Sequence, residues 1–137
     1  MGLIALLVAG FLHFWLSFRI DYWTTLDILG FKSELPVAFI QSPHGYRLLN
    51  IIFGIIVLCS PLLGGLEIYV GVVACIFVWL SSGVVGRNKA YERYRQIMRE
   101  MVSIAETDEE GEEYRAYASK SNSEIAEMVE QFVRAGR

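Results

Sequence analysis

The sequence lacks the short motifs that mark most catalytic and nucleotide-binding sites. It contains no Walker loop, no GxGxxG or GxSxG turn, no HExxH helix and no helix motif of paired carboxylates. Each of these motifs brings particular reactive or phosphate-binding groups together, so their absence leaves no basis for assigning a reaction. We therefore predict that the chain is not an enzyme by itself, while a place within an enzyme complex stays open.

Cysteine is scarce and is not arranged as a metal site. Cys59 and Cys75 both lie in apolar stretches, with no CxxC pair and no Cys/His spacing typical of a metal centre. Two such cysteines do not make a disulfide framework, and small buried apolar side chains are their ordinary interpretation. No metal and no cofactor is predicted from this composition.

Charged residues are nearly absent from three long stretches, residues 2–18, 43–64 and 66–85. A helix needs about 20 mostly apolar residues to cross the hydrocarbon core of a bilayer. The hydrophobic fraction of the chain is 54%, and its excess over an average soluble protein lies almost entirely in residues 1–86. The sequence therefore predicts an all-α integral membrane protein, with three transmembrane helices and a helical cytoplasmic C-terminal tail, residues 87–137.

The first apolar stretch, residues 2–18, has neither the basic region nor the small-residue cleavage site of a secretory signal. It is at the short end of the range for a span. His13 is the ionisable group that interrupts it, and Arg19 closes it. We interpret it as a retained anchor that crosses the bilayer. A tilted or interfacial helix that does not cross is the alternative.

Residues 19–42 mix aromatic and aliphatic side chains with charged ones. This composition is typical of a segment that lies in the headgroup region of a membrane. Packing against a partner subunit is the alternative. Gly30 and Pro36 divide the segment into two pieces.

The second and third apolar stretches are predicted to form a hairpin. Ser42 and Pro43 mark the beginning of a helix, because serine is a common cap and proline is tolerated at the first helical position. Pro61, Gly64 and Gly65 predict a tight turn before the third helix. Two spans joined by so few residues must run antiparallel.

The distribution of Lys and Arg predicts the orientation. The first connection has Arg19, Lys32 and Arg47 at its edges, the turn at residues 61–66 has no basic residue, and residues 87–99 have five. Because basic loops stay in the cytoplasm, we predict a multi-pass protein of the plasma (inner) membrane. Its N-terminus is expected outside and its C-terminus in the cytoplasm.

The third helix is expected to continue past the membrane, because residues 87–104 contain neither proline nor glycine. Thr107 with Glu110, and Ser121 with Glu124, have the spacing of capping boxes and predict two further tail helices. The last of these has an apolar face of Ile125, Met128, Val129, Phe132 and Val133.

The tail provides the surfaces that we expect to meet other molecules. Basic residues between 87 and 99 are predicted to lie beside the cytoplasmic leaflet, where anionic lipid headgroups attract each by about 1 kcal/mol. An ordinary positive-inside anchor accounts for most of this cluster. The modest basic field and the acidic run that follows argue against nucleic-acid binding. The expected partner or lipid contacts are Arg87, Lys89, Arg93, Arg95, Tyr91, Tyr94, Met98, Met128 and Phe132.

Two histidines are the candidates for a cofactor site. His13 could bind haem iron or a metal, with His44 as a second ligand, or it could hydrogen-bond across helices. A pair of histidines without a carboxylate or cysteine beside it is poor evidence for a metal, so we favour the structural role and keep haem as the alternative. Asn50 is expected to bond a neighbouring helix.

Small residues four apart predict close approach of the membrane helices. Gly71 with Cys75, and Ser82 with Gly86, have this spacing in the third stretch. Side chains of this size allow two helix backbones to come near each other.

Three functions remain. We favour a non-catalytic accessory or small structural subunit of a larger membrane protein complex, because aromatic and amphipathic surfaces need partner subunits to cover them. The second is a self-assembling homo-oligomeric pore, either a small channel or a holin, since the layout is similar in topology to one holin class. The third is a cofactor-binding subunit built on His13 and His44. The polar residues that could line a pore are Asn50, Ser60, Ser81 and Ser82.

Overall fold

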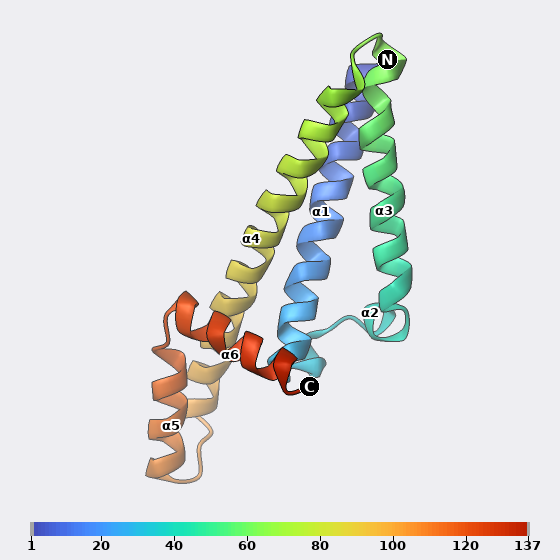
Figure 1. Cartoon of the computed structure of the whole chain (residues 1–137). Helices are drawn as coiled ribbons and strands as arrows, with labels where there is room; N and C mark the ends of the chain where they lie inside the picture. Colours follow the sequence, from blue (N-terminus) through green and yellow to red (C-terminus); the bar gives the residue numbers. More distant parts are fainter. Residues whose placement is uncertain (1, 137) are drawn as a thin grey trace.

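The computed structural model describes residues 2–136, and every regular element in that range is a helix. The elements are α1 (Gly2–Ile28), the 3₁₀-helix η1 (Lys32–Glu34), α2 (Val37–Gln41), α3 (Pro43–Cys59), the 3₁₀-helix η2 (Ser60–Gly64), α4 (Ile68–Val102), α5 (Asp108–Ala118) and α6 (Asn122–Arg134) (Figure 1).

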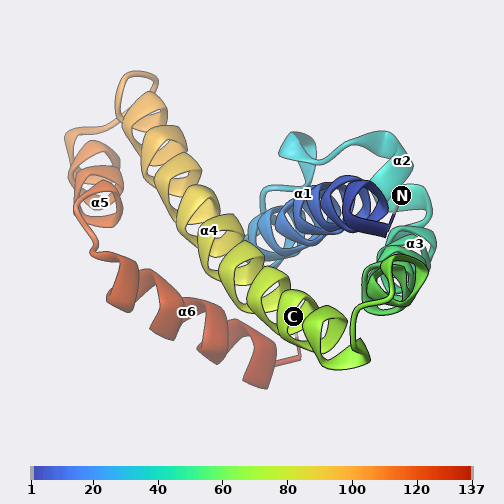
Figure 2. The same cartoon turned by 90° about the horizontal axis from the view of Figure 1, so that it is seen from above.

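Three helical segments are long and apolar enough to span a membrane, namely α1, α3 continued by η2, and α4. They come together at the end that carries the N-terminus and η2, and they spread apart toward the opposite end (Figure 1). The helix α1 packs against both α3 and α4. Figure 2 shows α5 and α6 on the side of α4 that faces away from α2 and α3.

The first helix is longer than the apolar stretch that predicted it. It continues past Phe18 to Ile28, because no glycine or proline interrupts the sequence before Gly30, whose φ is +91°. Leu26 of this extension and Ala90 of α4 are completely buried in a shared core. The extension is therefore held by packing, and the connection expected over residues 19–42 begins only at residue 29.

The shortened connection folds onto the bundle through aromatic side chains. Trp23 of α1 packs against Phe39 of α2 with ring centroids 5.0 Å apart, and against Tyr46 of α3 at 5.6 Å. Phe39 and Tyr46 complete the triangle at 5.6 Å. Aromatic pairs at these distances contribute about 0.5–1.5 kcal/mol beyond their buried area, so the cluster fixes α2 between α1 and α3.

The helix α3, which corresponds to the second apolar stretch, begins and ends where the sequence indicated. Pro43 occupies its first turn and Ser42 is the N-cap residue, although the Ser42 side chain makes no capping hydrogen bond within the described residues. The chain then turns through η2 and reverses at Gly65, whose φ is +72°. Glycine adopts this left-handed conformation without steric cost, which allows α4 to return beside α3.

The prediction that the third helix continues beyond its apolar stretch is confirmed. The 35 residues of α4 form one uninterrupted helix, about 52 Å long at 1.5 Å per residue. Its second half carries the tail, since α5 and α6 both contact it.

Both tail helices begin at the caps that the sequence predicted. The Thr107 side chain accepts a hydrogen bond from the Glu110 N–H. Ser121 and Glu124 form a complete capping box, and the hydrogen bonds from Ser121 lower the pKa of the Glu124 carboxyl. One residue further on, Ile125 is fully buried against α4, so the cap sets the point at which α6 docks.

Close backbone contact at two glycines joins α4 to its neighbours. A Cβ atom at Gly86 would lie 2.7 Å from the Phe18 carbonyl oxygen and 3.0 Å from the Asp21 Cβ. A Cβ at Gly71 would overlap the backbone of Leu58 in α3. The small-residue spacing therefore marked two helix contacts, one with α1 and one with α3.

We predict that Gly86→Ala lowers the free energy of unfolding by about 1–3 kcal/mol, because α1 and α4 must separate to admit the methyl group. Gly10→Ala is the matched control, since a Cβ there meets no atom of the described residues within 4 Å. Titration with SDS in mixed micelles measures both. Equal stability of the two variants would contradict the close contact.

Candidate functional site

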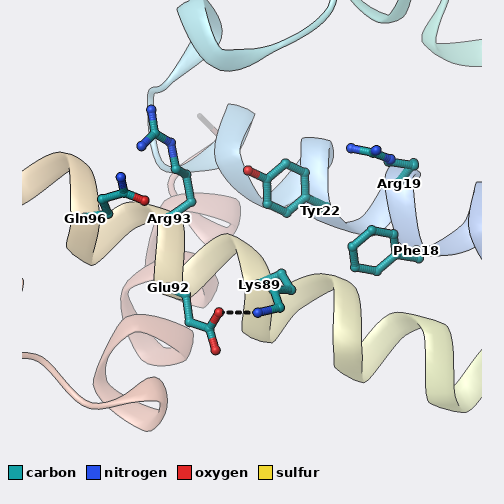
Figure 3. Close-up of a pocket in the computed structure, with 7 residues that line it drawn as sticks. All are labelled: Phe18, Arg19, Tyr22, Lys89, Glu92, Arg93 and Gln96. Carbon is teal, nitrogen blue, oxygen red and sulfur yellow. Dashed lines mark hydrogen bonds and ion pairs between the residues drawn. The ribbon is translucent and has the colours of Figure 1, made fainter.

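A pocket of about 350 Å³ lies between α1 and α4, where the apolar part of each helix ends. Figure 3 shows its lining residues, which come from α1 and from α4. The residues are Phe18, Arg19, Tyr22, Lys89, Glu92, Arg93 and Gln96.

Arg19 is held against aromatic rings at one edge of this pocket. Its guanidinium carbon lies 5.5 Å from the centre of the Trp15 ring, 5.9 Å from Phe18 and 5.8 Å from Trp23. Cation–π contact within about 6 Å is attractive, and Arg is the cation best suited to stacking on aromatic faces. The Arg19 Nε–H is buried and has no hydrogen-bond acceptor among residues 2–136.

The two basic side chains of α4 in this pocket are paired differently. Lys89 Nζ lies 2.6 Å from the Glu92 carboxylate, and both side chains are more than half exposed. Such a surface pair contributes little and exchanges readily with solvent. Arg93 donates two hydrogen bonds to Glu34 of η1, at 2.9 and 3.0 Å, and a third to Glu100 at 3.3 Å. Arg93 therefore holds η1 against α4, whereas Lys89 is free to reorient.

The pocket as a whole is suited to an anion that accepts hydrogen bonds. Arg19, Lys89 and Arg93 bring three positive charges to its wall, and Tyr22 and Gln96 add neutral donors. The charge of Arg93 is balanced by Glu34 and Glu100, which lie beside the pocket. Glu92 is its one acidic lining residue, and it is already paired with Lys89.

The other two basic residues expected to contact lipid or a partner lie elsewhere. Arg95 donates hydrogen bonds to the Lys120 carbonyl oxygen at 3.3 Å and to Asn122 Oδ1 at 2.7 Å, and so ties α4 to the turn between α5 and α6. Arg87 lines a second pocket, of about 170 Å³, together with Asp21.

The apolar residues expected to contact a partner are packed within the chain. A buried cluster between α4 and α6 consists of Tyr91, Tyr94, Met98 and Ile125. Met128 packs against this cluster, and Phe132 is partly buried. Partner contact through these side chains stays a prediction, and it would require α6 to move away from α4.

Polar side chains inside the apolar part of the bundle bond one another across α1 and α3. His13 Nδ1–H donates to Asn50 Oδ1 at 2.8 Å, and the Ser17 hydroxyl donates to the same oxygen at 3.0 Å. His13 is 8% exposed, and its ring packs against Gly54. The expectation that Asn50 bonds a neighbouring helix is confirmed, and His13 has the structural partner that we favoured.

The two histidines do not converge on one site. His44 is six residues before Asn50 in α3, which places it about 9 Å further along the axis and on another face of the helix. No group of three or more His, Cys, Asp or Glu side chains suited to a metal is found within residues 2–136. A cofactor on His13 and His44 therefore gains no geometric support, and haem stays an untested alternative.

The sequence analysis did not assign Arg19, Tyr22 or Ser17 to any site. Arg19 was treated as the end of the anchor and Tyr22 as part of the connection. The absence of glycine and proline before Gly30 could have shown that the helix continues past Arg19. On a continuous helix, Arg19 and Tyr22 are three residues apart and therefore lie on one face.

No protein-family model matches this chain, and no curated protein and no solved structure matches it either. The geometry of its own residues therefore has to support any functional assignment.

We predict that the His13–Asn50 hydrogen bond appears as a coupling of about 1 kcal/mol in a double-mutant cycle, the size found for hydrogen bonds between membrane helices. The variants are His13→Ala, Asn50→Ala and the double substitution, with SDS titration as the measurement. Ser81→Ala is the control, because its hydroxyl bonds the Phe77 carbonyl of its own helix. Strictly additive effects of His13→Ala and Asn50→Ala would contradict the bond.

Proposed function

We propose that this chain is a non-catalytic structural subunit of a larger membrane protein complex. In this proposal α1, α3 and α4 cross the plasma (inner) membrane, the N-terminus and η2 lie outside, and the tail lies in the cytoplasm. The observation that supports it best is the continuous helix α4, which joins the apolar bundle to a tail folded against it. A rigid connection of this kind holds neighbours in place and needs no reactive group.

The cytoplasmic end is fastened to α4 by polar contacts as well as by the apolar core. Arg93 bonds Glu34 of η1 on one side of the helix, and Arg95 bonds Lys120 and Asn122 between the tail helices. Both connections come from the same turn of α4, because Arg93 and Arg95 are two residues apart. A tail held in this way moves as one unit with the third span, which suits a subunit that positions its partners.

The outer surface of the spans gives the partner a place to bind. On α4 a row of exposed apolar side chains follows the helical spacing of four, four and three residues, and comparable side chains are exposed on α1 and α3. The row on α4 is Tyr69, Val73, Phe77 and Leu80. Lipid or a second subunit covers such surfaces equally well by chemistry, so the experiment below distinguishes them.

The polar side chains support the pore alternative less well than the subunit role. Ser60 is 2% exposed and Ser82 is completely buried, and each hydroxyl bonds a carbonyl of its own chain, Val57 and Trp79 respectively. Asn50 is engaged with α1. A pore assembled from several copies needs polar side chains on an outward face, and these three point into the monomer. Ser81 is partly exposed, and its hydroxyl bonds the Phe77 and Val78 carbonyl oxygens of its own helix.

The position of the basic pocket supports the proposed orientation of the chain in the membrane. The pocket with Arg19, Lys89 and Arg93 is lined by the second half of α1 and the second half of α4, on the side of the bundle away from the N-terminus and η2. Three spans place this end and the tail on one side of the membrane, and basic residues favour the cytoplasmic side.

We predict that a photo-crosslinking residue at one or more outward positions captures a different protein in the native membrane as a single discrete adduct. The positions are Phe11, Ile51 and Phe77, whose exposures are 68%, 58% and 71%. Leu26, which is completely buried, is the matched control and should give no adduct. The products are identified by mass spectrometry.

Adducts between two copies of this chain only would favour the pore, and lipid adducts alone would leave no subunit partner in the membrane plane. Either result would overturn the proposed function.

A further inference from the structure

The pocket between α1 and α4 lies at a defined depth in the bundle. Phe18, the last residue of the first apolar stretch, lines it, and Lys89 follows the end of the third stretch by about one helical turn. When α1 and α4 are inserted, these two positions meet the boundary between hydrocarbon and headgroups. That is the depth at which the phosphate groups of the cytoplasmic leaflet lie.

We propose that this pocket binds the phosphate of one anionic phospholipid, with Arg19 and Lys89 as the residues that hold it. The acyl chains would lie along the exposed apolar surface of α1, whose residues Phe11 and Trp15 continue from the pocket toward the N-terminus. The proposal rests on the insertion of α1 and α4 but not on the role as a subunit.

Arg19 has the features of a residue prepared for this ligand. Three aromatic rings fix its guanidinium, and its Nε–H is buried without an acceptor in the described chain. A buried donor without a partner is unfavourable. A phosphate oxygen would reach this N–H once the Arg19 side chain turns outward, and the new hydrogen bond would then replace an unsatisfied donor. Arginine also matches phosphate through parallel N–H···O bonds.

Lys89 completes the site from the other helix. Its ion pair with Glu92 joins two side chains that are 58% and 56% exposed, so the pair is easily exchanged for a phosphate. Arg93 contributes charge nearby, while its hydrogen bonds to Glu34 and Glu100 keep it in place. Close packing at Gly86 fixes the distance between the two helices and hence between Arg19 and Lys89.

The site is distinct from general attraction of a basic tail to the membrane. Among the four basic residues that the sequence analysis assigned to lipid or partner contact, Arg93 and Arg95 are occupied by contacts within the chain, and Arg87 lies in another pocket. Arg19, which was not assigned, is the residue with a buried donor still unsatisfied.

The test is native mass spectrometry of the purified full chain in nonionic detergent, titrated with dioleoyl phosphatidylglycerol. We expect one tightly held lipid per chain. Arg19→Gln and Lys89→Gln should each weaken its binding about tenfold, the loss expected for one charge-assisted hydrogen bond. Arg134→Gln is the matched control, because Arg134 is exposed on α6 and pairs with Glu130, and it should bind lipid like the unsubstituted chain.

Two further probes distinguish the source of the phosphate. Inorganic phosphate in millimolar excess should not displace the lipid, and dioleoyl phosphatidylcholine should bind more weakly and without sensitivity to Arg19→Gln. Displacement by inorganic phosphate would show a site for free anions, and equal binding of both lipids would show adhesion of acyl chains alone. Each of these results overturns the proposal.

Unchanged phosphatidylglycerol binding by both Arg19→Gln and Lys89→Gln would also overturn it. Size-exclusion chromatography and circular dichroism check that each variant is folded. If Arg19→Gln fails this check, the exposed Lys89→Gln still decides the question. Because the titration uses the isolated chain, its outcome does not depend on whether a partner subunit is found by crosslinking.

Discussion

The contact of Gly86 with the backbone of Phe18 is the constraint on which most of the structure depends. It brings α4 close enough to α1 that Leu26 and Ala90 meet in a common core one turn further along. The same contact sets Arg19 opposite Lys89 across the pocket. Small residues are the usual means of such close approach between apolar helices, because burying apolar surface gains little when lipid is the solvent.

Polar side chains inside the bundle hold α1 on its other face, where it packs against α3. One oxygen, Asn50 Oδ1, accepts from both His13 and Ser17 and so fastens α3 to α1. Buried polar side chains are costly unless they are hydrogen-bonded, which explains why these three lie together rather than on the outer surface of the bundle. The helix α1 is thereby fixed on two sides, by polar contact with α3 and by close backbone contact with α4. The tail is then supported by the second half of α4, and α6 also contacts α1.

Local signals were sufficient to predict much of this fold. The three apolar stretches, Pro43, the turn at Gly65 and the caps at Thr107 and Ser121 all act within a few residues, and the structure has each of them. The end of α1 was misplaced because loss of hydropathy at Arg19 was read as the end of the helix, whereas the chain breaks only at Gly30. The pocket could not be predicted, since it depends on the register between residues some seventy positions apart. The apolar face of α6 was recognised, but the sequence alone could not show that Tyr91 and Tyr94 of the same chain cover it.

The central claim, close contact between α1 and α4, is tested most directly by a disulfide formed in the native membrane. An ideal Cβ at Gly83 lies 3.9 Å from the Asp21 Cγ, so a chain with Asp21→Cys and Gly83→Cys should form a bond on mild oxidation after Cys59 and Cys75 are changed to Ser. Intact-mass measurement after alkylation should then show both thiols protected, whereas the pair Gly10→Cys and Gly83→Cys should be fully alkylated. Full alkylation of the first pair would contradict the packing of α1 against α4 and with it the pocket between them.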